Sequence, residues 1–175
     1  MHESSKTDDL KVADGGDGFT EVAAQPYIGD VLGDRVRNAD VVFVPESAFR
    51  EHPGPFFPQQ TEEFFAWVSE HIPVGVEVEA AVEDDDFREL GLHSELIILA
   101  HLLVTEAALP ITLGVISNYV WARIHSPHRE RAVRVSLTVV DDKKSRKRTK
   151  TFTYEGTPEN FPEACEKIER LWKSS

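Results

Sequence analysis

The residues best suited to metal chemistry are three consecutive aspartates, Asp84, Asp85 and Asp86, together with Glu46. The aspartates follow an alternating run that predicts a β-strand. Glu46 follows a short apolar run that predicts the neighbouring strand. Open α/β sheets bind ligands at the carboxyl ends of their strands, and carboxylate oxygens suit Mg²⁺. These residues are candidate ligands of a metal-dependent phosphoesterase or a nucleotide-binding protein. The alternative is a solvated acidic turn before a helix N-terminus.

A basic run, DDKKSRKRTK, is the second feature that points to a ligand or partner. Its candidate partner-binding residues are Lys143, Lys144, Arg146, Lys147 and Arg148. The chain has a formal net charge of −12, which disfavours nucleic acid as a partner at long range. Residues 1–95 hold 22 acidic and 6 basic side chains, whereas residues 96–175 hold 9 and 13. The run is interpreted either as a solvated hairpin tip or as a docking site for an acidic partner or a phosphate-bearing ligand.

Other catalytic patterns find little support in the sequence. No serine lies in a G-x-S-x-G motif, and DGGDG follows no strand, as a phosphate loop would. His101 is eight residues from His93 and five from Glu106, spacings that do not converge on one helix face, so it is interpreted as a polar contact near a helix pair. Cys165 is the single cysteine, which excludes an intramolecular disulfide, and is expected in the core. We expect no cofactor.

The least polar stretch, LIILAHLLVTEAALPITLGVISNYVW at 96–121, is long enough for a membrane span. Glu106 would lie near its middle, at a cost of about 2.5–3.5 kcal/mol on insertion, and Pro110 follows. These residues favour two shorter helices within about 94–124, roughly 94–108 and 111–124, buried by the sheet, by each other or by another subunit. A membrane-inserting effector acting through 96–121 is the alternative.

Strand and helix patterns on either side of this stretch predict an α+β fold in a single domain. Residues 40–44 and 74–82 predict strands that flank a helix at 61–72, a βαβ unit of about 40–82 with a parallel pair. The proline-rich connection at 45–60 is longer than the usual two to six residues or so, and it is interpreted as a loop or lid.

The C-terminal part predicts a hairpin and a helix over about 133–173. Residues 133–139 and 149–154 alternate as antiparallel strands. Asn160 and Glu163 form a capping-box pattern before a helix whose apolar stripe ends at Trp172.

The first 18 residues are rich in Asp, Gly, Ser and Lys and lack an apolar period. They predict a disordered acidic tail, which leaves 19–175 as the domain. They also lack the basic and apolar regions of a signal peptide, so a cytoplasmic location is expected.

The order of these elements resembles the effector-associated constant component proteins of bacterial conflict systems. The segments that carry the resemblance are LPITLGVISNYVWARI, VRVSLTVV and TFTYEGTPENFPEACEKIERL, within about 40–173. The long 45–60 connection and the acidic N-terminal half depart from that pattern. The resemblance implies a non-catalytic component that accompanies an effector, and it implies no site residues.

We therefore expect a non-enzymatic adaptor or accessory component of a bacterial defence or stress system. Its partner would be an effector or another protein, with a homo-oligomer as a further expectation. On the second apolar helix, the candidate partner-binding residues are Ile111, Val115, Tyr119 and Trp121.

Overall fold

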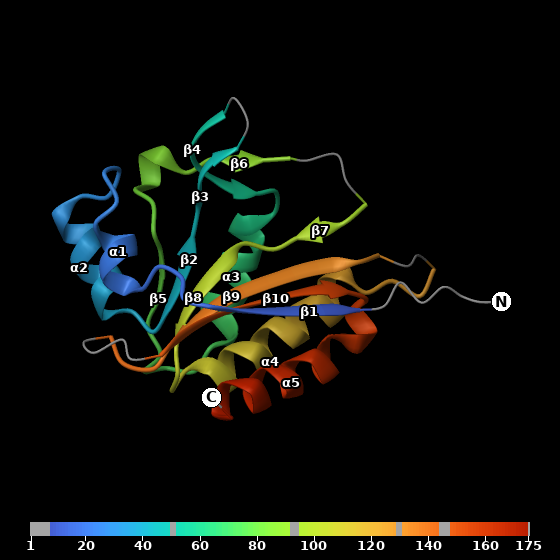
Figure 1. The fold of residues 1–175 in the computed structure, drawn as a ribbon. Helices are drawn as coiled ribbons and strands as arrows, with labels where there is room; N and C mark the ends of the chain where they lie inside the picture. The colour runs from blue at the N-terminus through green and yellow to red at the C-terminus, as the bar shows by residue number, and fades with distance from the viewer. Residues whose placement is uncertain (1–7, 50–51, 92–94, 129–130, 144–147, 175) are drawn as a thin grey trace.

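A seven-stranded mixed sheet forms the centre of this computed structural model, which describes residues 8–49, 52–91, 95–128, 131–143 and 148–174 (Figure 1). Its spatial order is β1 (Asp9–Asp14), β10 (Thr149–Gly156), β9 (Val133–Val140), β8 (His101–Thr105), β2 (Val41–Val44) and β5 (Val78–Ala80), with β7 (Ile97–Ile98) also pairing with β9. The predicted α+β class is confirmed.

Helices cover both faces of this sheet, but unequally. The larger core lies under α3 (Thr61–His71), α4 (Leu109–Tyr119) and α5 (Phe161–Lys173). A smaller core lies under α1 (Phe19–Ala23) and α2 (Asp30–Asn38), at the end of the sheet formed by β2 and β5 (Figure 1). Strand β2 is buried on both sides, because Val41 and Phe43 face the larger core and Val42 the smaller one. This explains its unbroken apolar run.

The predicted βαβ unit is confirmed, since β2 and β5 pair in parallel and α3 lies between them in the chain. The strand predicted at 74–82 is shorter than expected. The loop predicted at 45–60 is wrong: β3 (Glu46–Phe49), β4 (His52–Pro58) and β6 (Glu89–Leu90) form a second, three-stranded sheet. Burial of Phe56 and Phe57 ties this segment to the protein, and a small sheet of this kind tolerates proline at its edges.

The helix predicted at 94–108 is wrong. Residues of this segment form β7 and β8, and β8 lies between β9 and β2 as a central strand. Its side chains are buried on both faces, with Leu102 and Val104 in the larger core and Leu103 in the smaller one. A central strand of this kind shows the same all-round apolar pattern as a buried helix.

The second predicted helix is confirmed as α4, which continues into a π-helical turn, η2 (Val120–Ile124). Pro110 lies in the first turn of α4, where its missing N–H costs nothing. No helix of the described residues is long and apolar enough to cross a membrane.

The C-terminal hairpin and helix are confirmed, with β9 and β10 antiparallel and Phe161, Cys165, Ile168 and Trp172 buried on α5. The capping box is wrong. A 3₁₀ turn, η3 (Pro158–Asn160), precedes α5, and Asn160 makes no side-chain cap but donates through Nδ2 to Asp8. The side-chain amide of Asn160 therefore binds Asp8 and does not cap α5, as the local sequence pattern had predicted it would.

The tail predicted to be disordered is ordered over its described part. Strand β1 pairs with β10 along Asp9–Asp14, and the carboxylate of Asp8 accepts a hydrogen bond from Thr157 N at 2.9 Å. Gly15 and Gly16 follow with φ of 93° and 129°, a backbone that favours glycine. These contacts lie more than 130 residues away in the chain, so local composition did not reveal them.

Candidate functional site

The predicted metal ligands do not converge among the described residues. Asp84–Asp86 form a 3₁₀ turn, η1, while Glu46 starts β3 in the small sheet. Among the residues that the structure describes, no group of three or more His, Cys, Asp or Glu is placed to hold a metal ion.

Two neighbouring glutamates explain part of the acidic run instead. Glu83 Oε2 accepts the N–H of Gly29 at 2.7 Å, at the start of α2. Glu89 accepts the N–H groups of Gln60 and Glu62, both at 2.9 Å, at the start of α3. Carboxylates are stabilising at helix N-termini because free N–H groups and the helix dipole meet there.

Two residues of the predicted basic site make contacts within the protein. Lys143 donates to the carbonyls of Arg37 and Ala39 at the end of α2, and its ammonium lies 4.5 Å from the ring centre of Phe19. Burial lowers the pKa of Lys143 below its ordinary value. Arg148 pairs with Glu106 at 2.9 Å and lies over the ring of Trp172. Lys144, Arg146 and Lys147 lie outside the described residues.

The four candidates on the second apolar helix do not form one exposed face. Val115 and Tyr119 are buried, because α4 packs between α3 and α5. Ile111 is 40% exposed and Trp121 is 55% exposed. Of the two, Trp121 stands at the edge of a cleft.

This aromatic cleft has a volume of about 510 Å³ and lies where α3, the end of α4, η2 and the start of α5 meet. Its wall residues come from three segments of the chain, 67–71, 117–122 and 158–162: Trp67, His71, Ser117, Asn118, Trp121, Ala122, Pro158 and Pro162. Its volume falls within the range of about 300–1,000 Å³ that is usual for ligand pockets.

Each tryptophan of the cleft is held by a histidine one helical turn further on. The rings of Trp67 and His71 stack with centroids 4.0 Å apart, and those of Trp121 and His125 with centroids 3.8 Å apart. The sequence contained this signal as two W-x-x-x-H repeats, WVSEH and WARIH, because residues four apart share a helix face. Trp121 was among the predicted binding residues, but Trp67 and the repeated W-x-x-x-H pattern were not predicted.

An ion pair and a histidine–carboxylate contact border the cleft. Arg123 pairs with Glu63 at 3.5 Å and lies 5.5 Å from the ring centre of Trp67, and Nε2 of His125 lies 3.2 Å from Oε1 of Glu159. A cleft with an aromatic centre and a charged rim has the anatomy of a protein-binding site, in which tryptophan contributes strongly to affinity.

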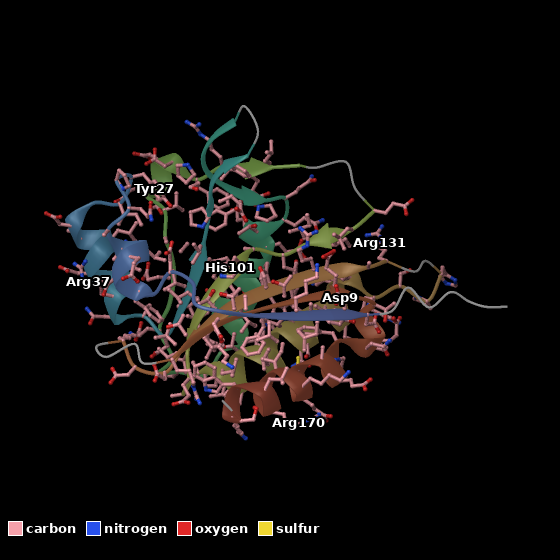
Figure 2. The ribbon with its side chains drawn as sticks, viewed as in Figure 1. Asp9, Tyr27, Arg37, His101, Arg131 and Arg170 are labelled. Atoms are coloured by element: carbon pink, nitrogen blue, oxygen red, sulfur yellow. The ribbon has the colours of Figure 1, made fainter. Side chains whose placement is uncertain are left out.

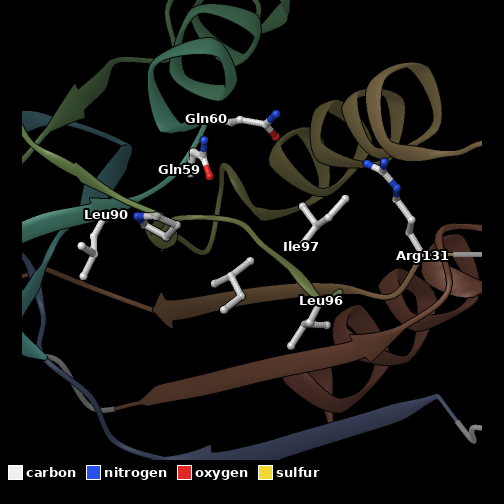
Figure 3. A pocket seen from close by; sticks show the side chains of 8 residues that line it. Gln59, Gln60, Leu90, Leu96, Ile97 and Arg131 are labelled. Atoms are coloured by element: carbon white, nitrogen blue, oxygen red, sulfur yellow. The ribbon is translucent and has the colours of Figure 1, made fainter. Parts of the chain in front are cut away.

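A smaller pocket of about 200 Å³ lies between the small sheet, the start of α3 and β7. Figure 3 shows Gln59 and Gln60 on one side of it and Ile97 and Arg131 on the other. It is smaller than the roughly 300 Å³ at which ligand pockets usually begin.

His101 is the polar contact that the sequence predicted, although it lies on a strand. Figure 2 shows it near the centre of the molecule. Its Nδ1 is 2.9 Å from Ser136 Oγ, and its Nε2 is 2.8 Å from Thr138 Oγ1. Thr138 Oγ1 is 2.9 Å from Thr151 Oγ1, which donates to the carbonyl of Gly15.

This chain of hydrogen bonds fixes the tautomer of His101. A hydroxyl has one proton. Because Thr151 donates its proton to Gly15, Thr138 must donate to Thr151, and the Nε2–H of His101 must donate to Thr138. In the neutral ring, Nδ1 then accepts the proton of Ser136. Burial keeps the ring neutral, since it lowers the pKa of His101 to about 4.

Compared with protein-family models, with curated proteins and with solved structures, the chain gives no match. The candidate site therefore stands on its geometry.

Proposed function

We propose that this protein is a non-enzymatic adaptor that binds a protein partner through the aromatic cleft. The observation that carries the proposal is Trp121, a large aromatic side chain that is 55% exposed at the edge of a cleft with a second tryptophan in its wall. Exposing this much indole to water is unfavourable, and covering it would contribute about 25 cal/mol for each Å² of apolar surface.

The lining of the cleft favours an extended, proline-bearing segment as the part of the partner that binds. Grooves lined by aromatic rings recognise such segments because their backbone is already extended and loses little entropy on binding. Trp67 supports this mode, since it contributes a second tryptophan to the wall beside the exposed Trp121.

In biological terms, the proposed partner is an effector of a bacterial defence or stress system. The support is the order of elements that resembles the constant components of such systems. The structure contains the helix α4, the hairpin β9–β10 and the helix α5 of that order, whereas residues 97–98 and 101–105 are strands where a helix was expected.

The three tryptophans provide a direct test. We would record the indole N–H signals of the ¹⁵N-labelled protein by NMR while adding a decaproline peptide. We expect the signals of Trp67 and Trp121 to move and that of Trp172 to stay, because Trp172 is buried and its Nε1 donates to Glu106 at 2.7 Å. Trp172 is thus a reference within the same molecule.

A variant separates cleft binding from unspecific contact. Trp121→Ala is expected to abolish the movement of the Trp67 signal, whereas Leu171→Ala, at another exposed apolar residue, is expected to leave it unchanged. If no indole signal moves, or if all three move together, the cleft is not a site for proline-bearing segments.

A further inference from the structure

A second surface lies at the opposite edge of the fold from β1, beside the terminal strand β5. It is a slot of about 340 Å³ with α2 on one side, α3 on the other and the residues after β5 at one end. Its floor is apolar, with Leu32, Phe65, Ala80, Val82 and Phe87. The ring of Phe87 packs against that of Phe57 at 5.6 Å, which anchors one end of the slot.

The backbone of β5 has an open edge beside this slot. Val41 N donates to Glu77 O at 3.0 Å and Ala81 N donates to Phe43 O at 2.9 Å, so residues 77, 79 and 81 bond with β2. In a parallel ladder the alternate residues point the other way. The N–H and C=O groups of Val78 and Ala80 therefore face away from β2, and β5 has no further strand beside it among the described residues.

The slot is acidic. Glu62, Glu79 and Asp84 line it, and Arg35 is the basic residue of its wall. Arg35 pairs with Glu79 at 3.5 Å, which leaves an excess of negative charge. The wider surroundings have the same sign, because residues 1–95 hold 22 acidic and 6 basic side chains. A basic partner would be attracted from a distance and held at this rim.

From the open strand edge, the apolar floor and the acidic rim together, we infer that this slot binds an extended basic segment of another protein, which adds to β5 as a further strand. Main-chain hydrogen bonds to Val78 and Ala80 supply affinity in this mode, and alternate side chains supply specificity. An apolar side chain fills the floor, and Lys or Arg on either side of it reaches Glu62 and Asp84. The inference does not depend on the aromatic cleft, but two separate surfaces are what an adaptor needs to join two proteins.

Three labelled peptides test the inference by fluorescence anisotropy on the whole chain. The first alternates lysine and valine over seven residues, the second replaces lysine with glutamate, and the third is the lysine peptide N-methylated at every residue. The third keeps its charge but has no backbone N–H to donate. We expect saturable binding of the first peptide and at least about tenfold weaker binding of the other two, as expected when main-chain hydrogen bonds or charge pairs are lost.

Matched variants locate the site on the protein. Glu62→Gln with Asp84→Asn is expected to weaken binding of the lysine peptide by about fivefold or more. Glu163→Gln with Glu166→Gln changes the net charge equally on the exposed face of α5 and is expected to leave it unchanged. Ala80→Pro removes an outward N–H but no bond to β2, so it is expected to abolish binding while the melting temperature stays close to that of the original chain.

Three results would overturn the inference. They are absence of binding by the lysine peptide, equal binding by the N-methylated peptide, and equal weakening by the two double variants. The second would show attraction by charge without strand addition, and the third would show that net charge alone is responsible. If Ala80→Pro melts early, the N-methylated peptide still decides the question, because it leaves the protein unchanged.

Discussion

Mild acid is expected to weaken the fold through His101. The ring donates to Thr138 through Nε2 and accepts from Ser136 through Nδ1, so the neutral form is the one that the hydrogen bonds satisfy. Burial lowers the pKa of His101 from 6.5 to about 4. The perturbation is a change of pH from 7 to 5, with and without this imidazole.

The sign of the change in stability depends on whether the folded or the unfolded chain binds a proton at the higher pH. The folded pKa lies below the unfolded pKa, so the unfolded chain takes up a proton as the pH falls, while the folded chain does not. The stability that neutral His101 contributes is complete above about pH 6.5 and is lost as the pH falls toward about 4. The full shift corresponds to about 3 kcal/mol, of which about 2 kcal/mol is lost between pH 7 and pH 5.

Urea unfolding followed by circular dichroism measures this loss. His101→Gln keeps a donor and an acceptor but cannot titrate, so the carboxylates and other histidines contribute equally to both chains. We expect the original chain to lose about 2 kcal/mol more than His101→Gln between the two pH values. His128→Gln, at an exposed histidine, serves as the control and should behave like the original chain. Equal losses in the original chain and His101→Gln would refute the reasoning.

Three further substitutions test contacts that hold the predicted elements together. Glu106→Ala should lower the free energy of unfolding by about 1–2 kcal/mol, because it removes an acceptor of the Trp172 Nε1–H and the partner of Arg148. Glu106→Gln keeps an acceptor and should cost less than about 1 kcal/mol. Equal costs of the two substitutions in urea unfolding would contradict this. Gly16→Ala should lower the free energy of unfolding by about 1–3 kcal/mol, since φ is 129° and a Cβ would lie 2.7 Å from Thr151 Oγ1. Ala13→Gly nearby should cost less. No change in stability with Gly16→Ala in the same assay would contradict this backbone conformation at Gly16. Lys143→Met should cost about 1 kcal/mol by removing the donor to the last carbonyls of α2, and an unchanged midpoint of thermal unfolding would show that Lys143 does not cap this helix.

Periodicity predicted the elements that bury one face. The helix α3, the hairpin β9–β10 and the stripe of α5 were correct because the period of each is visible in its own sequence. Strand β2, which is buried on both faces, was predicted instead from a short apolar run that Pro45 ends. The prediction failed at β8, which is also buried on both faces but lies in a longer apolar run that resembles a buried helix. It also failed at β1, a polar edge strand that is stabilised by β10 and by residues near the start of α5.

The candidate site was predicted only in part, for a related reason. Trp121 was visible as an aromatic residue at the end of an apolar helix, but the cleft needs Trp67 from α3, Pro158 from η3 and Pro162 from α5. Those segments meet only in the folded chain. The basic run shows the opposite case. Lys143 and Arg148 were candidate partner-binding residues, yet Lys143 donates to a carbonyl at the end of α2 and Arg148 pairs with Glu106.

The most direct test of the proposed adaptor role is complex formation with the products of the genes that lie beside this one. The purified chain and each product would be mixed and analysed by size-exclusion chromatography with light scattering, for the original chain, Trp121→Ala and Leu171→Ala. We predict a defined complex with one of these products that Trp121→Ala loses and Leu171→Ala keeps. A complex that forms equally well with Trp121→Ala, or no complex with any of the products, would contradict partner binding through the aromatic cleft.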